Sequence, residues 1–194
     1  HSKTPLLVIF YFEGFTNFLD CDLQAKHSHL EVQRIAVRCL GLFGLLEKKP
    51  SQELVKQLKL SFIKGPGPIS IVACKALFDL GMWHNPQEVD RVMGGSPQCQ
   101  DYDITSSPLN LSDTDGISNI KLLDLLYAGI MKDDWDNSLA SDENESIHCA
   151  LGEGFAKILL LSENYQGMPA SLHPLLLSKL ITLYFSNESK DLQR

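Results

Sequence analysis

Three short blocks of this sequence resemble one another, and their spacing limits the folds that the chain can adopt. Arg38–Gly44 aligns with Lys75–Gly81 at a spacing of 37 residues, and Cys149–Phe155 lies a further 74 residues along, which is twice that spacing. A period of this length is typical of repeat proteins, in which each repeat is one supersecondary unit. The blocks therefore predict three stacked repeats of a helix pair.

The first repeat begins with a predicted helix over residues 30–48. Apolar residues recur there every three or four positions, the period of one helix face. Arg34 and Arg38 fall on the other face. The spacing predicts that the following residues form the buried face: Ile35, Cys39, Leu42, Phe43 and Leu46.

Two further helices complete the predicted beginning of the stack. The second follows Pro50, with Ser51 as its N-cap, and stops at the turn over residues 65–68. The third helix follows that turn and packs, antiparallel, beside the first two. It ends at Asn85-Pro86, because the residue before a proline disfavours the helical region. The predicted apolar stripes are Leu54, Leu58 and Phe62 in the second helix, and Ile69, Val72, Ala73, Ala76, Leu77 and Leu80 in the third.

The second half of the chain alternates predicted helices with acidic loops. We expect loops near residues 86–116, with one helical turn over 87–92, and over 133–145. The intervening helices are striped by Ile117, Ile120, Leu123, Tyr127 and Ile130; by Ile147, Leu151, Phe155, Ile158 and Leu159; and by Leu172, Leu176, Leu180 and Leu183.

No segment alternates with the two-residue period of a strand, so the predicted fold is all-α, a HEAT-like α-solenoid of antiparallel helix pairs. Stacking the pairs removes their apolar faces from water at about 25 cal/mol per Å². Five glycines fall inside the predicted helices, where each costs about 1 kcal/mol relative to alanine. Close approach of neighbouring helices would offset that cost, and weak or frayed helices are the alternative. These glycines are Gly41, Gly44, Gly81, Gly152 and Gly154.

Composition excludes several classes of protein. With 44% apolar and 21% charged residues, the chain has enough apolar side chains for an ordinary core and is not disordered or collagen-like. The longest apolar run, Leu6 to Phe12, is far below the roughly 20 residues that cross a bilayer, so we expect a soluble protein without a membrane partner. The formal net charge of −7 argues against nucleic-acid binding through bulk charge.

The motifs of covalent and metal chemistry are absent from the sequence. Its five cysteines include no CxxC pair, which favours a reduced intracellular compartment, and no histidine stands at zinc-site spacing. Nucleophile-elbow, metalloprotease and phosphate-binding glycine motifs are missing as well. We therefore expect no enzymatic activity, no cofactor and no metal site.

The net charge conceals a strong division along the chain. Residues 26–64 hold eight basic and three acidic residues, a net +5, whereas residues 65–145 hold four basic and fourteen acidic residues, a net −10. A basic hairpin can follow a phosphate backbone without reading bases. The alternative is an ordinary solvated helix face. The candidate DNA contacts are Lys56, Lys59 and Lys64, followed by Arg34 and Arg38.

Three serines in the first acidic loop are candidate phosphorylation sites. Ser96 and Ser107 each precede a proline, the minimal site of proline-directed kinases, and Ser112 lies three residues before Asp115, a spacing that acidophilic kinases accept. Phosphates there would add negative charge to an acidic segment.

The sequence around the repeated blocks resembles a known family. The stretch from His29 to Glu47, the block Ala76–Gly81 and the later Glu153–Leu160 are similar to condensin subunit 3, a HEAT-repeat non-SMC component of condensin, and most similar to its plant form. The resemblance covers about residues 24–191. Residues 1–25 form an N-terminal segment of uncertain identity, residues 26–191 the predicted HEAT-repeat segment of about three helix pairs, and residues 192–194 its C-terminal end.

The resemblance implies a scaffold that binds the kleisin subunit of condensin. Members of this family help to hold DNA on mitotic chromosomes in the nucleus, while separate SMC ATPase subunits, which they contact indirectly, drive compaction. The resemblance assigns neither kleisin nor DNA contacts to named positions, so the DNA candidates come from local charge alone. The alternative is a solenoid that binds only protein, such as a transport adaptor, with no DNA contact.

Overall fold

The computed structural model describes residues 25–93, 120–132, 141–161 and 172–191. Within these ranges it contains seven helices and no strand, which confirms the predicted all-α fold. None of the described helices is both long enough and apolar enough to cross a membrane. The helices are α3 (Leu30–Leu46), α4 (Gln52–Lys64), α5 (Gly67–His84), α6 (Pro86–Val92), α7 (Leu122–Met131), α8 (Ser141–Leu160) and α9 (Leu172–Asp191).

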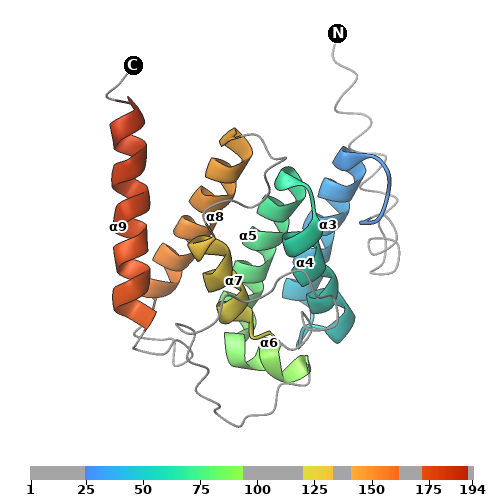
Figure 1. The fold of residues 1–194 in the computed structure, drawn as a ribbon. Helices are drawn as coiled ribbons and strands as arrows, with labels where there is room; N and C mark the ends of the chain where they lie inside the picture. The colour runs from blue at the N-terminus through green and yellow to red at the C-terminus, as the bar shows by residue number, and fades with distance from the viewer. Residues whose placement is uncertain (1–24, 94–119, 133–140, 162–171, 192–194) are drawn as a thin grey trace.

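The helices form two layers (Figure 1). In the first layer α5 packs between α3 and α8, and α9 follows on the far side of α8. Helices α4 and α7 lie on one side of α5 and form the second layer. The opposite side of α5 faces solvent. It carries Lys75, Asp79 and Trp83, which follow one another at intervals of four residues and are all exposed.

The three repeated blocks lie in α3, α5 and α8, the helices that pack side by side. Gly41 in α3 lies against Ala76 in α5, and Gly67 at the start of α5 lies against Glu143 at the start of α8, so neighbouring helices run parallel. Helix α5 contacts α8 directly, although their blocks are 74 residues apart. The doubled spacing therefore reflects extra chain between two adjacent repeats.

Glycines mark the points where these helices approach most closely. A Cβ atom at Gly41 would lie 2.7 Å from the Cβ of Ala76, and one at Gly154 would overlap the ring of Phe78. Gly44 and Gly81 are similarly crowded, by Leu80 and Leu122. The predicted close approach is thus confirmed at four positions. It is wrong for Gly152, where a Cβ would meet Leu180 at an ordinary 3.6 Å.

Helix α4 follows its sequence signals closely. The hydroxyl of Ser51 accepts a hydrogen bond from the N–H of Leu54 at 3.3 Å, the N-cap interaction that the sequence predicts. The predicted stripe of Leu54, Leu58 and Phe62 is fully buried. The helix ends at Lys64, immediately before the predicted turn.

The predicted buried face of α3 is wrong in part. Leu42 and Leu46 are 47% and 81% exposed, and Ile35 is only half-buried. The face that packs on α4 and α5 instead contains small residues, which allow close approach but contribute little to an apolar stripe. Its buried residues are Val32, Ala36, Val37, Cys39, Leu40, Gly41 and Gly44.

The structure describes only the ends of the two predicted acidic loops, and it shortens the second. The first begins with α6, which confirms the predicted turn over residues 87–92, and the second ends in helix, because α8 already starts at Ser141. The remainder of both loops, together with Ile117, lies outside the described residues. Most of the later stripes in α7 and α8 are confirmed by buried side chains: Leu123, Tyr127 and Ile130 in α7, and Ile147, Leu151, Phe155 and Ile158 in α8. Ile120, which precedes α7, and Leu159 are half-buried. The stripe of α9 is confirmed in part, because Leu176 is buried whereas Leu180 and Leu183 are half-buried.

Two glycines in α8 provide a matched test of this packing. Gly154→Ala should destabilise the chain by about 1–3 kcal/mol, because its methyl group overlaps the Phe78 ring. Gly152→Ala should be neutral or stabilising by up to about 1 kcal/mol, because the site has room and alanine favours helix. Urea unfolding of both variants measures the difference, and equal effects would contradict the close α5–α8 contact.

Candidate nucleic-acid interface

The basic hairpin, defined as residues 26–64, consists of α3, α4 and the turn between them. Arg34 and Arg38 lie four residues apart on an exposed face of α3, as predicted. A guanidinium nitrogen of Arg34 pairs with a carboxylate oxygen of Glu31 at 2.9 Å, and both side chains are exposed. Such a surface pair contributes little to stability. It does, however, offset part of the local positive charge.

Lys56 and Lys64 both project into solvent from α4. They are exposed and eight residues apart, so about 12 Å of helix separates them. Neither forms an ion pair with another residue that the structure describes. Lys64 also lies in the last turn, where the helix dipole favours a cation. These two lysines are the cations of α4 that are available to a phosphate backbone.

Lys59 is not available for such contacts, and its assignment as a DNA candidate is wrong. Its side chain is fully buried, and its ammonium donates a hydrogen bond to the carbonyl oxygen of Ile120 at 2.6 Å. The negative charges of Asp90 and Asp124 also act on it, from α6 and α7. Burial lowers the pKa of Lys59, and the two carboxylates oppose that change.

The two carboxylates complete a polar cluster that joins α4, α6 and α7. Asp90 accepts a hydrogen bond from the N–H of Leu122 at 2.7 Å. Burial raises the pKa of Asp90, while that hydrogen bond and the charge of Lys59 oppose the rise. Burial likewise raises the pKa of Asp124, opposed by Lys121 and Lys59. We call Lys59, Asp90 and Asp124 the Lys59 cluster.

One sequence signal could have identified Lys59 as buried. It lies four residues after Val55 and three before Phe62, within the apolar stripe of α4, whereas Lys56 and Lys64 lie outside that stripe. The acidic partners carry no comparable signal, because Asp90 is 31 and Asp124 is 65 residues away in sequence. Only the tertiary fold brings them to Lys59.

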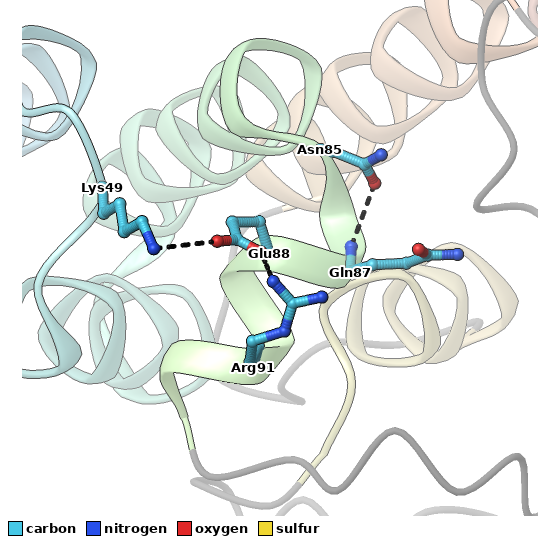
Figure 2. Close-up of polar contacts among 5 residues, drawn as sticks. All are labelled: Lys49, Asn85, Gln87, Glu88 and Arg91. Carbon is cyan, nitrogen blue, oxygen red and sulfur yellow. Dashed lines mark hydrogen bonds and ion pairs between the residues drawn. The ribbon is translucent and has the colours of Figure 1, made fainter.

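The turn of the basic hairpin is partly neutralised by α6. The ammonium of Lys49 lies 3.5 Å from a carboxylate oxygen of Glu88. Figure 2 shows Glu88 between Lys49 and Arg91, which also pairs with it. The same view shows the start of α6, where the side-chain oxygen of Asn85 accepts the N–H of Gln87 at 3.1 Å. The α3–α4 turn is therefore a weaker candidate for DNA than the exposed lysines of α4.

The part of the chain that the structure describes contains no candidate metal site and no disulfide. No group of three or more His, Cys, Asp or Glu residues there is arranged to hold a metal ion. Cys39, Cys74 and Cys149, all described, are not joined in disulfides. The candidate phosphorylation sites Ser96, Ser107 and Ser112 lie outside the described residues.

A family model decides what this helical stack belongs to. The family described as nuclear condensing complex subunits, C-terminal domain, matches residues 24–194, most of the sequence. The chain belongs to this family. No curated protein and no solved structure matches it significantly. Membership confirms the resemblance to condensin subunit 3, and it places the chain among the nuclear subunits of the complex that condenses chromosomes for cell division.

Substitution of Lys59 separates its structural role from DNA contact in this condensin chain. Lys59→Met should destabilise the fold by about 1–3 kcal/mol, because it leaves the carbonyl of Ile120 without its donor and removes the positive charge that acts on Asp90 and Asp124. Lys56→Met, one turn earlier and exposed, should change stability by less than about 0.5 kcal/mol. Urea unfolding at neutral pH measures both.

A rescue experiment checks the cause of that loss. Adding Asp90→Asn and Asp124→Asn to the Lys59→Met chain removes both charges but keeps an oxygen that can accept the Leu122 N–H. Part of the lost stability should return. Absence of any recovery would show that Lys59 acts through its hydrogen bond to Ile120 and its packing, and not through the two carboxylates.

Proposed function

We propose that this chain is a non-enzymatic scaffold segment of condensin that binds kleisin and contributes to DNA engagement on mitotic chromosomes. The observation that carries the proposal is the family match over a helical stack, combined with exposed lysines on its basic hairpin that pair with no described carboxylate. ATP hydrolysis and compaction are assigned to the SMC subunits, so the scaffold needs no reaction centre of its own.

The DNA contact proposed here is to the phosphate backbone. Lys56 and Lys64 of α4 are its first candidates, and Arg34 and Arg38 of α3 are second, because Arg34 already pairs with Glu31. Within α4 no aromatic residue is exposed beside these lysines, so base stacking is not expected. Specificity for chromosomal sites would then come from other subunits of the complex.

Protein binding is supported by exposed apolar residues on the outer helices of the stack. Leu42 and Leu46 are exposed on α3. On α9, a stripe of exposed apolar residues recurs at helical spacing, separate from the buried Leu176: Leu177, Ile181, Tyr184 and Phe185. Exposed apolar groups of this kind mark surfaces that contact other proteins. This feature alone also fits the alternative of a solenoid that binds only protein.

A salt titration tests the DNA part of the proposal. In the assembled complex, Lys56→Glu combined with Lys64→Glu should weaken binding to duplex DNA at low salt. If both lysines contact phosphates, the slope of log affinity against log salt should fall in magnitude by about 1.8, because each neutralised phosphate contributes about 0.9. Fluorescence anisotropy at several salt concentrations gives both quantities.

The control is Lys75→Glu, which alters an exposed lysine of α5 outside the basic hairpin. It should leave the salt slope unchanged. If the double variant binds DNA like the unaltered complex, the α4 contact is wrong and the protein-only alternative is favoured.

A pull-down tests the protein part separately. The chain should retain kleisin fragments in the absence of DNA, and Lys56→Glu with Lys64→Glu should not affect their capture, because these lysines are proposed for DNA alone. Failure of every kleisin fragment to bind would contradict the scaffold role.

A further inference from the structure

The same polar cluster holds the chain on both sides of residues 94–119. Asp90 lies three residues before Met93, the last described residue ahead of that stretch, and Ile120 is the first described residue after it. The carboxylate of Asp90 accepts the N–H of Leu122 at 2.7 Å, and the ammonium of Lys59 donates to the carbonyl of Ile120 at 2.6 Å. The two flanks therefore meet each other at Asp90 and Leu122, and the second flank is also bonded to a buried cation on α4.

These contacts also supply what the start of α7 lacks in its own sequence. Its N-cap residue, Lys121, makes no side-chain capping hydrogen bond. Asp90 takes over that role from α6, because it accepts the N–H of the first residue of α7 and places a carboxylate at the positive end of the helix. The start of α7 is thus bonded to α6 directly and to α4 through Ile120.

Apolar side chains also pack where α6 meets the start of α7. Val89 and Leu122 are completely buried and Met93 is nearly so. Leu122 also reaches α5, where its side chain lies 3.0 Å from the position that a Cβ of Gly81 would take. All of these contacts are made by residues outside 94–119.

We infer that Lys59 and Asp90, through Ile120 and Leu122, form a clamp that joins the chain across residues 94–119, which makes this acidic stretch an insertion whose length and charge do not affect the solenoid. The direct contact of α5 with α8, despite doubled repeat spacing, fits such an insertion. The entropy of joining two ends changes only slowly with the length between them. Phosphates on Ser96, Ser107 or Ser112 would then act on binding partners and not on the fold. The clamp itself does not depend on the proposed function.

The test shortens the insertion in the 194-residue chain. Residues 97–116 are replaced by six Gly and Ser residues, which leaves a connection of about twelve residues, able to span roughly 40 Å when extended. The melting temperature should stay within about 2 °C of the original, as should that of the full 194-residue chain with Ser96→Glu, Ser107→Glu and Ser112→Glu. Lys59→Met should lower it by roughly 5 °C in both the full and the shortened chain.

Lys56→Met is the matched control and should change neither chain. If shortening alone lowers the melting temperature as much as Lys59→Met, the replaced residues belong to the fold and the inference is wrong. If the Lys59→Met chains do not fold, Asp90→Ala replaces them, with a loss expected in both chains because the N–H of Leu122 loses its acceptor. A loss that differs between the full and shortened chains would contradict a clamp independent of the insertion.

Discussion

The close parallel packing of α3, α5 and α8 is the contact on which the rest of this structure depends. Gly41 lets α3 approach the backbone of α5 at Ala76, and Gly154 leaves space in α8 for the ring of Phe78, so a side chain at either glycine would collide with α5. Glycine inside a helix costs about 1 kcal/mol relative to alanine. The burial of Phe78 and Phe155, whose rings meet edge to face at 5.1 Å, is part of what offsets that cost. The second layer of α4 and α7 then rests on this platform.

The sequence predicted the elements of this fold better than it predicted their faces. The predictions for α4 agree with the structure at its N-cap, its apolar stripe and its C-terminal end, because all three signals lie within one short segment. The face of α3 was wrong because hydrophobic periodicity weights large side chains. Leu42 and Leu46 are large and exposed, whereas Ala36 and Gly44 are small and pack against neighbouring helices. Which stripe is buried depends on the partners, and the partners are set by the tertiary fold.

The same limit applies to charge. Counting cations in residues 26–64 predicts a basic hairpin. A count cannot, however, distinguish a side chain that is exposed to water from one that already forms a hydrogen bond or an ion pair within the chain. Lys59 is buried against a carbonyl, Lys49 faces Glu88 and Arg34 faces Glu31. Lys56 and Lys64 are exposed on the same helix. The sequence therefore located the basic region correctly, and the structure decides which of its members can reach a phosphate.

Burial of Lys59 also explains why one helix carries both a structural and a surface role. Burying a lysine in an apolar stripe costs free energy unless a hydrogen-bond acceptor and negative charges accompany it. For Lys59 the acceptor is the carbonyl of Ile120, just before α7, and the carboxylates are those of Asp90 in α6 and Asp124 in α7. Asp90 and Ile120 lie on either side of residues 94–119, so the surroundings of this one cation include both ends of the described chain there. Lys56, a single turn away, has no part in this requirement, so its charge can serve binding without affecting the fold. Neighbouring lysines of identical chemistry thus differ in role because only one of them lies on the side of α4 that faces α6 and α7.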